Sequence, residues 1–199
     1  RFYPPSYGFR PYRAQKHAIR DIINVINAGC KSPYQAVWAV EGDIQGCFDN
    51  ISHRILLQKV WRMGIHDKRV LKIISQMLKA GYIERDLYHK TETGTPQGGI
   101  LSPLLSNIYL NDFDWYVGRT YMEPHRKCKH KCNDTRRLKW AGTTPKYNFR
   151  YADDWVVLPS TEKEAFRMKR ELTKYFRQKL KLELSQEKPY VTDLRKGGI

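Results

Sequence analysis

The stretch Phe149-Arg-Tyr-Ala-Asp-Asp-Trp-Val-Val-Leu158 places two adjacent aspartates inside an otherwise apolar segment of strand character. Aspartate is depleted in strands, and two neighbouring carboxylates repel each other. A tight turn tolerates both residues, so one interpretation of Asp153 and Asp154 is the tip of a simple β-hairpin. The other interpretation is a cation site, and this segment alone leaves both open.

A third carboxylate favours the cation site. Asp43 follows the short apolar run 36–40, which has the size of a buried strand. A carboxylate at the end of one central strand can approach the tip of an adjacent hairpin. Oxygen ligands suit Mg²⁺ rather than Zn²⁺, and buried carboxylates without a cation are costly. Asp43, Asp153 and Asp154 therefore predict two Mg²⁺ ions ~3.5–4 Å apart, arranged for an in-line phosphoryl displacement.

Hydrophobic periodicity predicts an α+β fold around these carboxylates. Apolar residues recur at helical spacing in five segments, near 13–28, 50–64, 67–81, 102–113 and 161–176. Strand character covers 36–40, 149–158 and 180–184, and a hairpin is expected within 82–95. We expect the Ser102 hydroxyl to cap the fourth helix, with Pro103 at its first position. Helices mixed with a small antiparallel sheet define the α+β class.

The charge balance indicates a polyanionic partner. Lys and Arg total 36 against 20 Asp and Glu, a net charge of +16. Such an excess attracts nucleic acid, although a generally basic surface is the alternative interpretation. No apolar run approaches the ~20 residues that a membrane helix needs, so no membrane partner is expected. Four cysteines are too few for a secreted disulfide scaffold, which favours a reducing, intracellular setting.

The segment 117–148 differs from the rest because it has little apolar periodicity and many Lys and Arg residues. His125, Cys128, His130 and Cys132 could form a small zinc site. Their spacing departs from the usual C-x₂-C pairing, and no second matching pair is present. We therefore interpret 117–148 as an inserted basic loop that contacts structured RNA.

Five blocks of the sequence resemble those of reverse transcriptases, most closely those encoded by group II introns. In chain order they are Ser6-Tyr-Gly-Phe-Arg-Pro-Tyr-Arg13, Gly42-Asp-Ile-Gln-Gly-Cys-Phe-Asp-Asn-Ile51, Gly94-Thr-Pro-Gln-Gly-Gly-Ile-Leu-Ser-Pro-Leu-Leu-Ser-Asn-Ile-Tyr-Leu110, Arg150-Tyr-Ala-Asp-Asp154 and Leu182-Glu-Leu-Ser-Gln-Glu-Lys188. The block 94–110 is the most specific. Tyr12 departs from the pattern, which more often has Gly or Lys there, and 117–148 is the gap in the resemblance.

The resemblance implies a right-hand polymerase palm, with a small antiparallel sheet packed on helices and part of the fingers. Residues 1–35 would form the fingers and the fingers–palm junction, and 36–199 the palm with its inserted loop. Further fingers blocks are expected before Arg1, and the thumb after Ile199.

The resemblance also assigns the metal ligands. Asp43 and Asp153 would bind both Mg²⁺ ions, for which Mn²⁺ is a possible substitute, with Asp154 beside them. The backbone carbonyl of Ile44 would add a ligand. We interpret Asp49 as a helix cap near the site rather than as a third ligand.

Further residues of the blocks would surround the nucleotide. Gly46 and Cys47 would offer backbone amides to the triphosphate, because small residues permit close approach. Phe48 would lie under the sugar and exclude a ribose 2′-hydroxyl, although a core aromatic is the alternative. Gln97 would pack on the incoming nucleotide.

The remaining implied contacts concern the template and the leaving group. Gly98 and Gly99 would let the template strand pass close to the backbone. Lys188 would lie near the pyrophosphate as a general acid, or would be a solvated lysine. Arg10 and Arg13 would meet template or nucleotide phosphates, and surface salt bridges are the alternative.

The implied function is that of a group II intron reverse transcriptase-maturase. Deoxynucleotides (dNTPs) would be added to a DNA primer opposite an RNA template, and the intron RNA would be bound for splicing and mobility. The alternatives are a splicing maturase without polymerase activity, a retron- or diversity-type reverse transcriptase, and an RNA-dependent RNA polymerase. A bacterial cytoplasm or an organelle is the expected location. The oligomeric state is open, with a homodimer among the alternatives.

Overall fold

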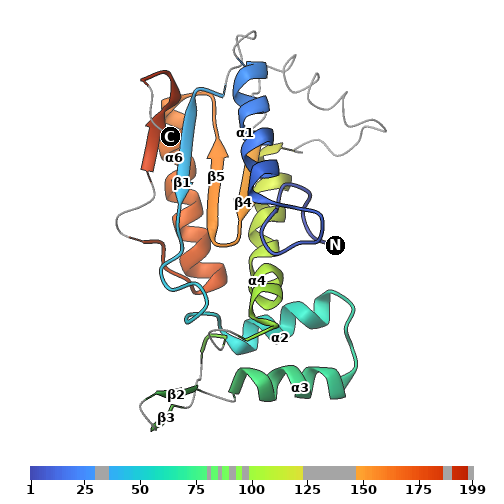
Figure 1. The fold of residues 1–199 in the computed structure, drawn as a ribbon. Helices are drawn as coiled ribbons and strands as arrows, with labels where there is room; N and C mark the ends of the chain where they lie inside the picture. Colours follow the sequence, from blue (N-terminus) through green and yellow to red (C-terminus); the bar gives the residue numbers. More distant parts are fainter. Residues whose placement is uncertain are drawn as a thin grey trace.

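A four-stranded antiparallel sheet with the order β4-β5-β1-β6 forms the centre of the computed structural model (Figure 1). The structure describes residues 1–29, 36–79, 82–84, 87–89, 93–95, 99–122, 147–185 and 190–196. The strands are β1 (Trp38–Gly42), β4 (Tyr147–Tyr151), β5 (Asp154–Leu158) and β6 (Tyr190–Asp193). A separate two-stranded hairpin pairs β2 (Tyr82–Glu84) with β3 (Leu87–His89).

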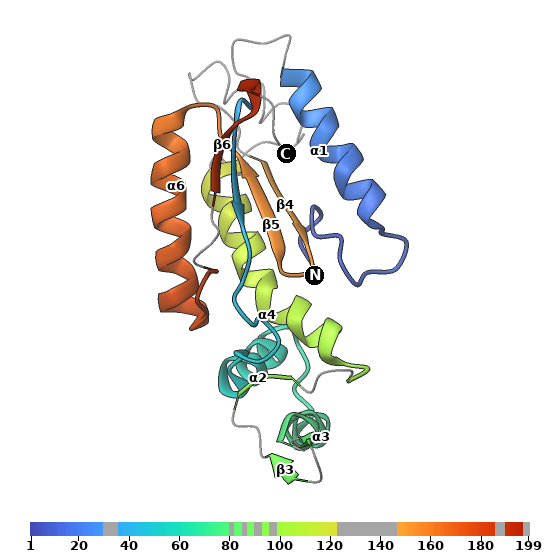
Figure 2. The ribbon, with the colours of Figure 1, turned by 60° about the vertical axis from the view of Figure 1, so that its left-hand side comes forward.

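Helices cover both faces of this sheet and one of its ends. They are α1 (Gln15–Gly29), α2 (His53–Arg62), α3 (Lys68–Lys79), α4 (Ser102–Val117) and α6 (Glu162–Tyr175). Two π-helical turns, η1 (Gly118–Met122) and η2 (Phe176–Leu180), extend α4 and α6, and a 3₁₀ turn, η3 (Leu194–Lys196), follows β6. Helices α1 and α6 lie on opposite sides of the sheet (Figure 2).

Alternation along the strands builds a separate apolar cluster on each face. Val40 of β1 points into the main core with α4 and α6, whereas its neighbour Ala39 points to the smaller cluster under α1. Successive strand residues face opposite sides, so both are fully buried. Helix α4 is buried almost all round, which explains its weak amphipathic pattern.

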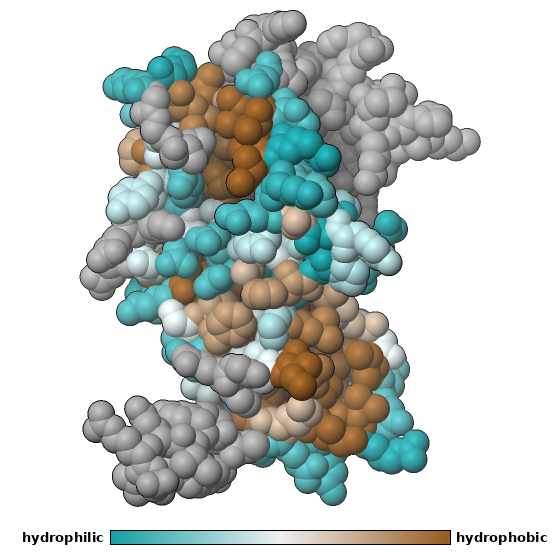
Figure 3. Space-filling model, in the orientation of Figure 1, coloured by the Kyte–Doolittle hydropathy of each residue, from teal (hydrophilic) through white to brown (hydrophobic). Residues whose placement is uncertain are grey.

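Helices α2 and α3 pack together at the lower end of the molecule in Figure 1. Helix α3 buries Leu78 and leaves the stripe Val70, Ile73 and Met77 exposed. Apolar surface accordingly gathers over this end of the molecule (Figure 3). Two helix starts are capped by side chains: the Asp67 carboxylate accepts from the Arg69 N–H at 2.7 Å before α3, and the Thr161 hydroxyl accepts from the Glu164 N–H before α6.

The α+β class and the palm-like arrangement are confirmed, but three local predictions were wrong. Helix α4 already includes Ser102, and its N-cap position is Leu101, so the start lies one residue earlier than predicted. The strand expected at 180–184 is not formed, because η2 continues to Leu180 and Lys181 takes a left-handed conformation (φ 54°). The strand that completes the sheet is instead β6.

The bounds of the loop expected at 117–148 are also wrong at both ends. Residues 117–122 continue the helix through η1, and 147–148 already belong to β4. The possible zinc ligands lie outside the described residues, as does the rest of the segment, 123–146.

Candidate active site

The aspartate pair forms the tip of the β4–β5 hairpin, as the first interpretation of this segment predicted. Tyr151 pairs with Asp154 across the turn, and Ala152 has a left-handed φ of 57°. Asp153 is half-buried, whereas Asp154 is exposed. The turn therefore directs one carboxylate inward and the other toward solvent.

Asp43 lies at the same end of the sheet. The last β1–β5 pair is Gly42 with Trp155, and continuing this antiparallel register by one residue brings Asp43 level with Asp154. The pKa of Asp153 is raised, first by burial and then by the negative charges of Asp154 and Asp43. Asp43 and Asp154 are thus close enough to Asp153 to disfavour ionisation of its carboxyl group.

The chain beyond Asp43 stays extended and pairs with residues 183–185. The Ser185 N–H donates to the Asp43 carbonyl at 3.0 Å, and the Gln45 N–H donates to the Glu183 carbonyl at 3.0 Å. Ile44 stands opposite Leu184 between these two bonds. In this position its own N–H and C=O point away from 183–185, toward the side of β1 on which β5 lies.

A tight turn follows at 46–50. Gly46 has a φ of +53°, and its carbonyl accepts from the Asp49 N–H at 3.0 Å and the Asn50 N–H at 3.1 Å. Cys47 is buried, with its Sγ 3.8 Å from Ser106 Oγ on α4. Burial raises the pKa of the Cys47 thiol to about 12, so this side chain is a neutral packing group.

Phe48 is half-buried and its backbone is fixed by residues 93–95. The Thr95 N–H donates to the Phe48 carbonyl at 2.7 Å. Gly94 has a φ of +90°, and a Cβ there would lie 2.7 Å from the Asp49 carbonyl oxygen. Only glycine tolerates that approach, so the block at 94–110 begins in contact with the turn at 46–50.

Of the residues expected to meet nucleotide and template, Gly99 lies just before α4, where its carbonyl accepts from the Ser102 N–H at 3.0 Å. Ile100 beside it is 95% exposed. The predictions for Gln97, Gly98 and Lys188 fall outside the described residues.

Arg10 and Arg13 bind their own segment. Arg10 Nη1 donates to the carbonyls of Tyr3 (2.9 Å) and Ser6 (2.7 Å). Arg13 donates to the Pro4 carbonyl, and its guanidinium lies over the Tyr7 ring, with its carbon 5.1 Å from the ring centroid. Both guanidinium groups therefore hold the loop before α1 in shape.

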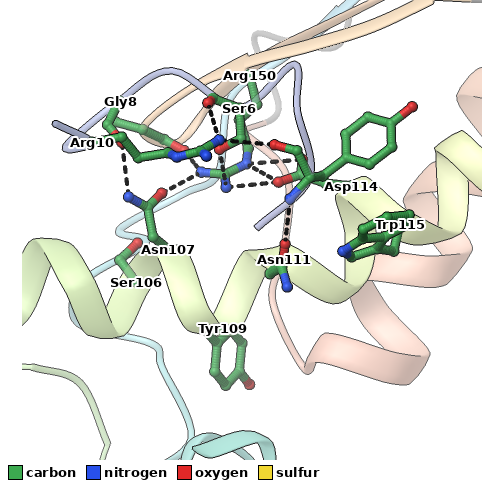
Figure 4. A network of polar contacts seen from close by, with 12 residues as sticks. Ser6, Gly8, Arg10, Ser106, Asn107, Tyr109, Asn111, Asp114, Trp115 and Arg150 are labelled. Carbon is green, nitrogen blue, oxygen red and sulfur yellow. Dashed lines mark hydrogen bonds and ion pairs between the residues drawn. The ribbon is translucent and has the colours of Figure 1, made fainter. Parts of the chain in front are cut away.

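A buried arginine, which sequence reasoning missed, anchors the aspartate hairpin (Figure 4). Arg150 donates from Nε and Nη2 to the Asp114 carboxylate at 2.7–3.0 Å, and the two side chains are 0% and 1% exposed. Its Nη1 donates to Asn107 Oδ1 at 3.0 Å and to the Ala152 carbonyl at 2.5 Å. Burial raises the pKa of Asp114, and the Arg150 guanidinium acts against this.

The same arginine ties the N-terminal segment to the hairpin. Ser6 pairs in parallel with Arg150, and its Oγ accepts from Arg150 Nη2 at 2.8 Å. Asn107 Nδ2 donates to the Gly8 carbonyl at 2.8 Å. A Cβ on Gly8 would lie 2.3 Å from the Ala152 nitrogen, so this backbone rests directly against the turn. The signal in the sequence was the spacing of polar residues at 107, 111 and 114 within an otherwise apolar helix.

The donor set at this end of the sheet fits a divalent cation by its chemistry, because every candidate ligand is an oxygen. Among the residues that the structure describes, however, no three His, Cys, Asp or Glu side chains lie in a geometry that could already hold a metal ion. Asp43, Asp153 and Asp154 share a neighbourhood, and their side chains would have to converge further around a bound ion.

A small antiparallel sheet with an aspartate hairpin beside a strand-end aspartate, backed by helices, is the arrangement of a polymerase palm. Residues 1–193 match the family described as reverse transcriptase (RNA-dependent DNA polymerase). The chain belongs to this family.

Individual relatives agree with the family match. The chain is 36% identical to the group II intron-encoded protein LtrA of Lactococcus lactis subsp. cremoris, over 94% of this chain and 37% of that protein. It is 34% identical to protein YkfC of Escherichia coli (strain K12), over 100% of this chain and 54% of that protein. The chain thus spans about a third to a half of the length of these relatives.

The fold agrees with solved structures. Apo telomerase from Candida tropicalis superposes with a TM-score of 0.66 at 12% identity, over 97% of this chain and 34% of that one. Reverse transcriptases generally use divalent metal ions. None of the helices in the described ranges is long and apolar enough to cross a membrane.

Proposed function

We propose that this chain is the catalytic palm, with part of the fingers, of a group II intron-encoded RNA-directed DNA polymerase. It would add deoxynucleotides to a DNA primer opposite an RNA template and release pyrophosphate. The observation that carries the proposal is the position of Asp43 beside the Asp153–Asp154 hairpin, in a chain that matches the reverse transcriptase family over residues 1–193.

In this proposal Asp43 and Asp153 hold two Mg²⁺ ions, or Mn²⁺ in their place, with Asp154 beside them. When bound, the ions activate the attacking primer hydroxyl and neutralise the triphosphate and leaving oxygen. The backbone of Ile44 supports the assignment of its carbonyl as a ligand, because that carbonyl is turned away from residues 183–185. A bound cation would also offset the burial and the neighbouring negative charges that raise the pKa of Asp153.

The turn at 46–50 would receive the nucleotide. Its positive φ at Gly46 and the small side chain of Cys47 support close approach of a triphosphate to backbone amides. Phe48 would lie under the sugar and discriminate against ribonucleotides, and its fixed backbone supports that role. Gln97 against the nucleotide and Lys188 near the pyrophosphate remain predictions from the resemblance.

The template would pass Gly98 and Gly99 at the start of α4. Arg10 and Arg13 remain predicted phosphate contacts, with an additional role in shaping their loop. Each guanidinium has five N–H donors, so the observed carbonyl bonds leave donors for a phosphate. A group II intron RNA is the proposed structured partner, because LtrA, the relative at 36% identity, is a group II intron-encoded protein.

Primer extension tests the proposal. With a DNA primer on an RNA template and Mg²⁺, the protein is expected to incorporate dNTPs well and NTPs poorly, and Asp153→Asn is expected to abolish incorporation. Full activity of Asp153→Asn would refute the metal assignment. Equal use of NTPs would favour an RNA polymerase. No incorporation alongside tight binding of intron RNA would favour a splicing maturase without polymerase activity.

A further inference from the structure

Helix α4 also lines a cleft, on a different face of the helix from the one that carries Asn107 and Asp114. Its volume is about 720 Å³, and it opens between α2, the α4–η1 helix and the α6–η2 helix. Each helix contributes one stripe of residues at helical spacing, such as 112, 115, 116 and 119 from α4 and η1. Asp43, Asp153 and Asp154 are not among its lining residues.

The rim of this cleft carries three cations. Arg62, Arg119 and Lys179 are exposed, and none forms an ion pair with a carboxylate of the described residues. Three unneutralised positive charges around one cavity favour an anionic ligand.

A buried lysine lies deeper in the same cleft. The Lys59 side chain is 7% exposed and lies with Nζ 3.1 Å from Asp112 Oδ2. It also donates to the Tyr109 carbonyl at 2.5 Å. Burial lowers the pKa of Lys59, while Asp112 acts in the opposite direction. Asp112, the only carboxylate in the lining among the residues that the structure describes, is thereby paired, so the rim charges stay available to a ligand.

Aromatic rings form the wall between these charges. Tyr116 and Tyr175 stack with ring centroids 4.2 Å apart and an interplanar angle of 17°. The Arg119 guanidinium carbon lies 5.1 Å from the Trp115 ring centroid. All three rings are partly exposed. Flat apolar surfaces beside cationic groups suit unpaired nucleobases, whose faces stack on aromatic side chains while their phosphates meet Arg and Lys.

We propose that this cleft binds a segment of single-stranded RNA, with phosphates at Arg62, Arg119 and Lys179 and bases against Trp115, Tyr116 and Tyr175. The site goes beyond the proposed polymerase function, because it requires neither Mg²⁺ nor the catalytic carboxylates. An acidic peptide would satisfy the charges but would leave the aromatic wall without a matching partner. The lining contains none of Arg10, Arg13 and Gly99, so RNA binding here would not use the proposed template contacts.

The test measures binding of a fluorescein-labelled 12-nucleotide single-stranded RNA by anisotropy, in EDTA and over a range of salt concentrations. The triple variant Arg62→Gln, Arg119→Gln, Lys179→Gln removes three phosphate contacts. For single-stranded nucleic acid, each phosphate contact contributes ~0.7 to the slope of log affinity against log salt concentration. Loss of three contacts is therefore expected to lower this slope by about 2, and the affinity by about 100-fold near 0.1 M salt. The matched control Lys68→Gln, Lys72→Gln, Lys163→Gln changes the charge equally, outside the cleft.

A second measurement locates the RNA. With 4-thiouridine in the oligonucleotide, photocrosslinks are expected on Trp115, Tyr116 or Tyr175 and should disappear in the triple variant. Crosslinks confined to other segments, or equal losses of affinity in the two triple variants, would overturn the proposal. So would a polyglutamate peptide that binds as tightly as the RNA with the same sensitivity to the cleft substitutions. If primer extension fails while RNA still binds the cleft in the presence of EDTA, only the proposed polymerase function would be overturned.

Discussion

Removing the Asp114 carboxylate should reveal how strongly the buried arginine holds the aspartate hairpin. In Asp114→Ala, Arg150 keeps its neutral acceptors on Ser6, Asn107 and Ala152 but loses its countercharge. Both side chains are almost fully buried, so the guanidinium charge cannot be solvated. Breaking a buried ion pair on one side costs about 3–5 kcal/mol, against a typical total stability of roughly 5–15 kcal/mol.

Urea unfolding followed by circular dichroism measures this cost. If the free energy of unfolding falls by roughly 2–3 kcal/mol per M of urea, the unfolding midpoint of Asp114→Ala should lie about 1–2.5 M lower in urea than that of the unmodified protein. Arg177→Gln is the matched control, because the Arg177–Glu183 pair has a similar N–O distance of 2.9 Å but side chains that are 71% and 56% exposed. Its midpoint should hardly move.

A double variant replaces the whole buried ion pair. Arg150→Met with Asp114→Leu fills the same space with apolar groups and should regain much of the lost stability. The reasoning is refuted if Asp114→Ala shifts the midpoint no more than the Arg177 control does.

Four further outcomes are expected. The pKa of Asp153 is raised in the folded protein, so ionisation of this carboxyl group destabilises the fold as pH rises through that pKa. Asp153→Asn should therefore raise Tm in EDTA at pH 7 and should lose this advantage at acidic pH. An equal gain in Tm at both pH values would contradict the assignment. Cys47, with a pKa of about 12, should resist iodoacetamide at pH 8 in the folded protein, as peptide mass spectrometry can check. Gly8→Ala should cost about 1–3 kcal/mol in urea unfolding, since its Cβ would overlap the Ala152 nitrogen; unchanged stability would mean that the contact is not maintained. Phe48→Val should increase NTP incorporation relative to dNTP incorporation in primer extension, and an unchanged ratio would remove the steric role.

The neighbourhood of the three aspartates could be predicted because the relevant signals are local. An apolar run before Asp43 and an interrupted strand around Asp153 each report one strand end, and antiparallel pairing brings those ends together. The anchoring of Asp114 by Arg150 was not predictable in the same way. It links residues 36 positions apart, and the polar spacing at 107, 111 and 114 does not show which residue Asp114 meets.

The wrong strand at 180–184 has a different origin. Leu180, Leu182 and Leu184 are buried in alternation with exposed residues, as the pattern indicates. Burial on one side does not require a paired strand, and only the Ile44–Leu184 bridge connects this segment to the sheet. Strand β6 went unnoticed because its residues are only partly buried and its sequence, Tyr-Val-Thr-Asp, carries little apolar signal.

The parallel pairing of Ser6 with Arg150 also sets the order in which the protein can be assembled during translation. The two residues are 144 positions apart. A ribosome adds roughly 5–20 residues per second, so about 7–29 s pass between the synthesis of the N-terminal segment and that of its partner. Over that interval the segment has no β4 to join, and non-local pairings of this kind are slow to form. The end of the sheet that carries the aspartates is therefore completed only after β4 has been synthesised, and slow elongation lengthens the time for which Ser6 and its neighbours lack this partner.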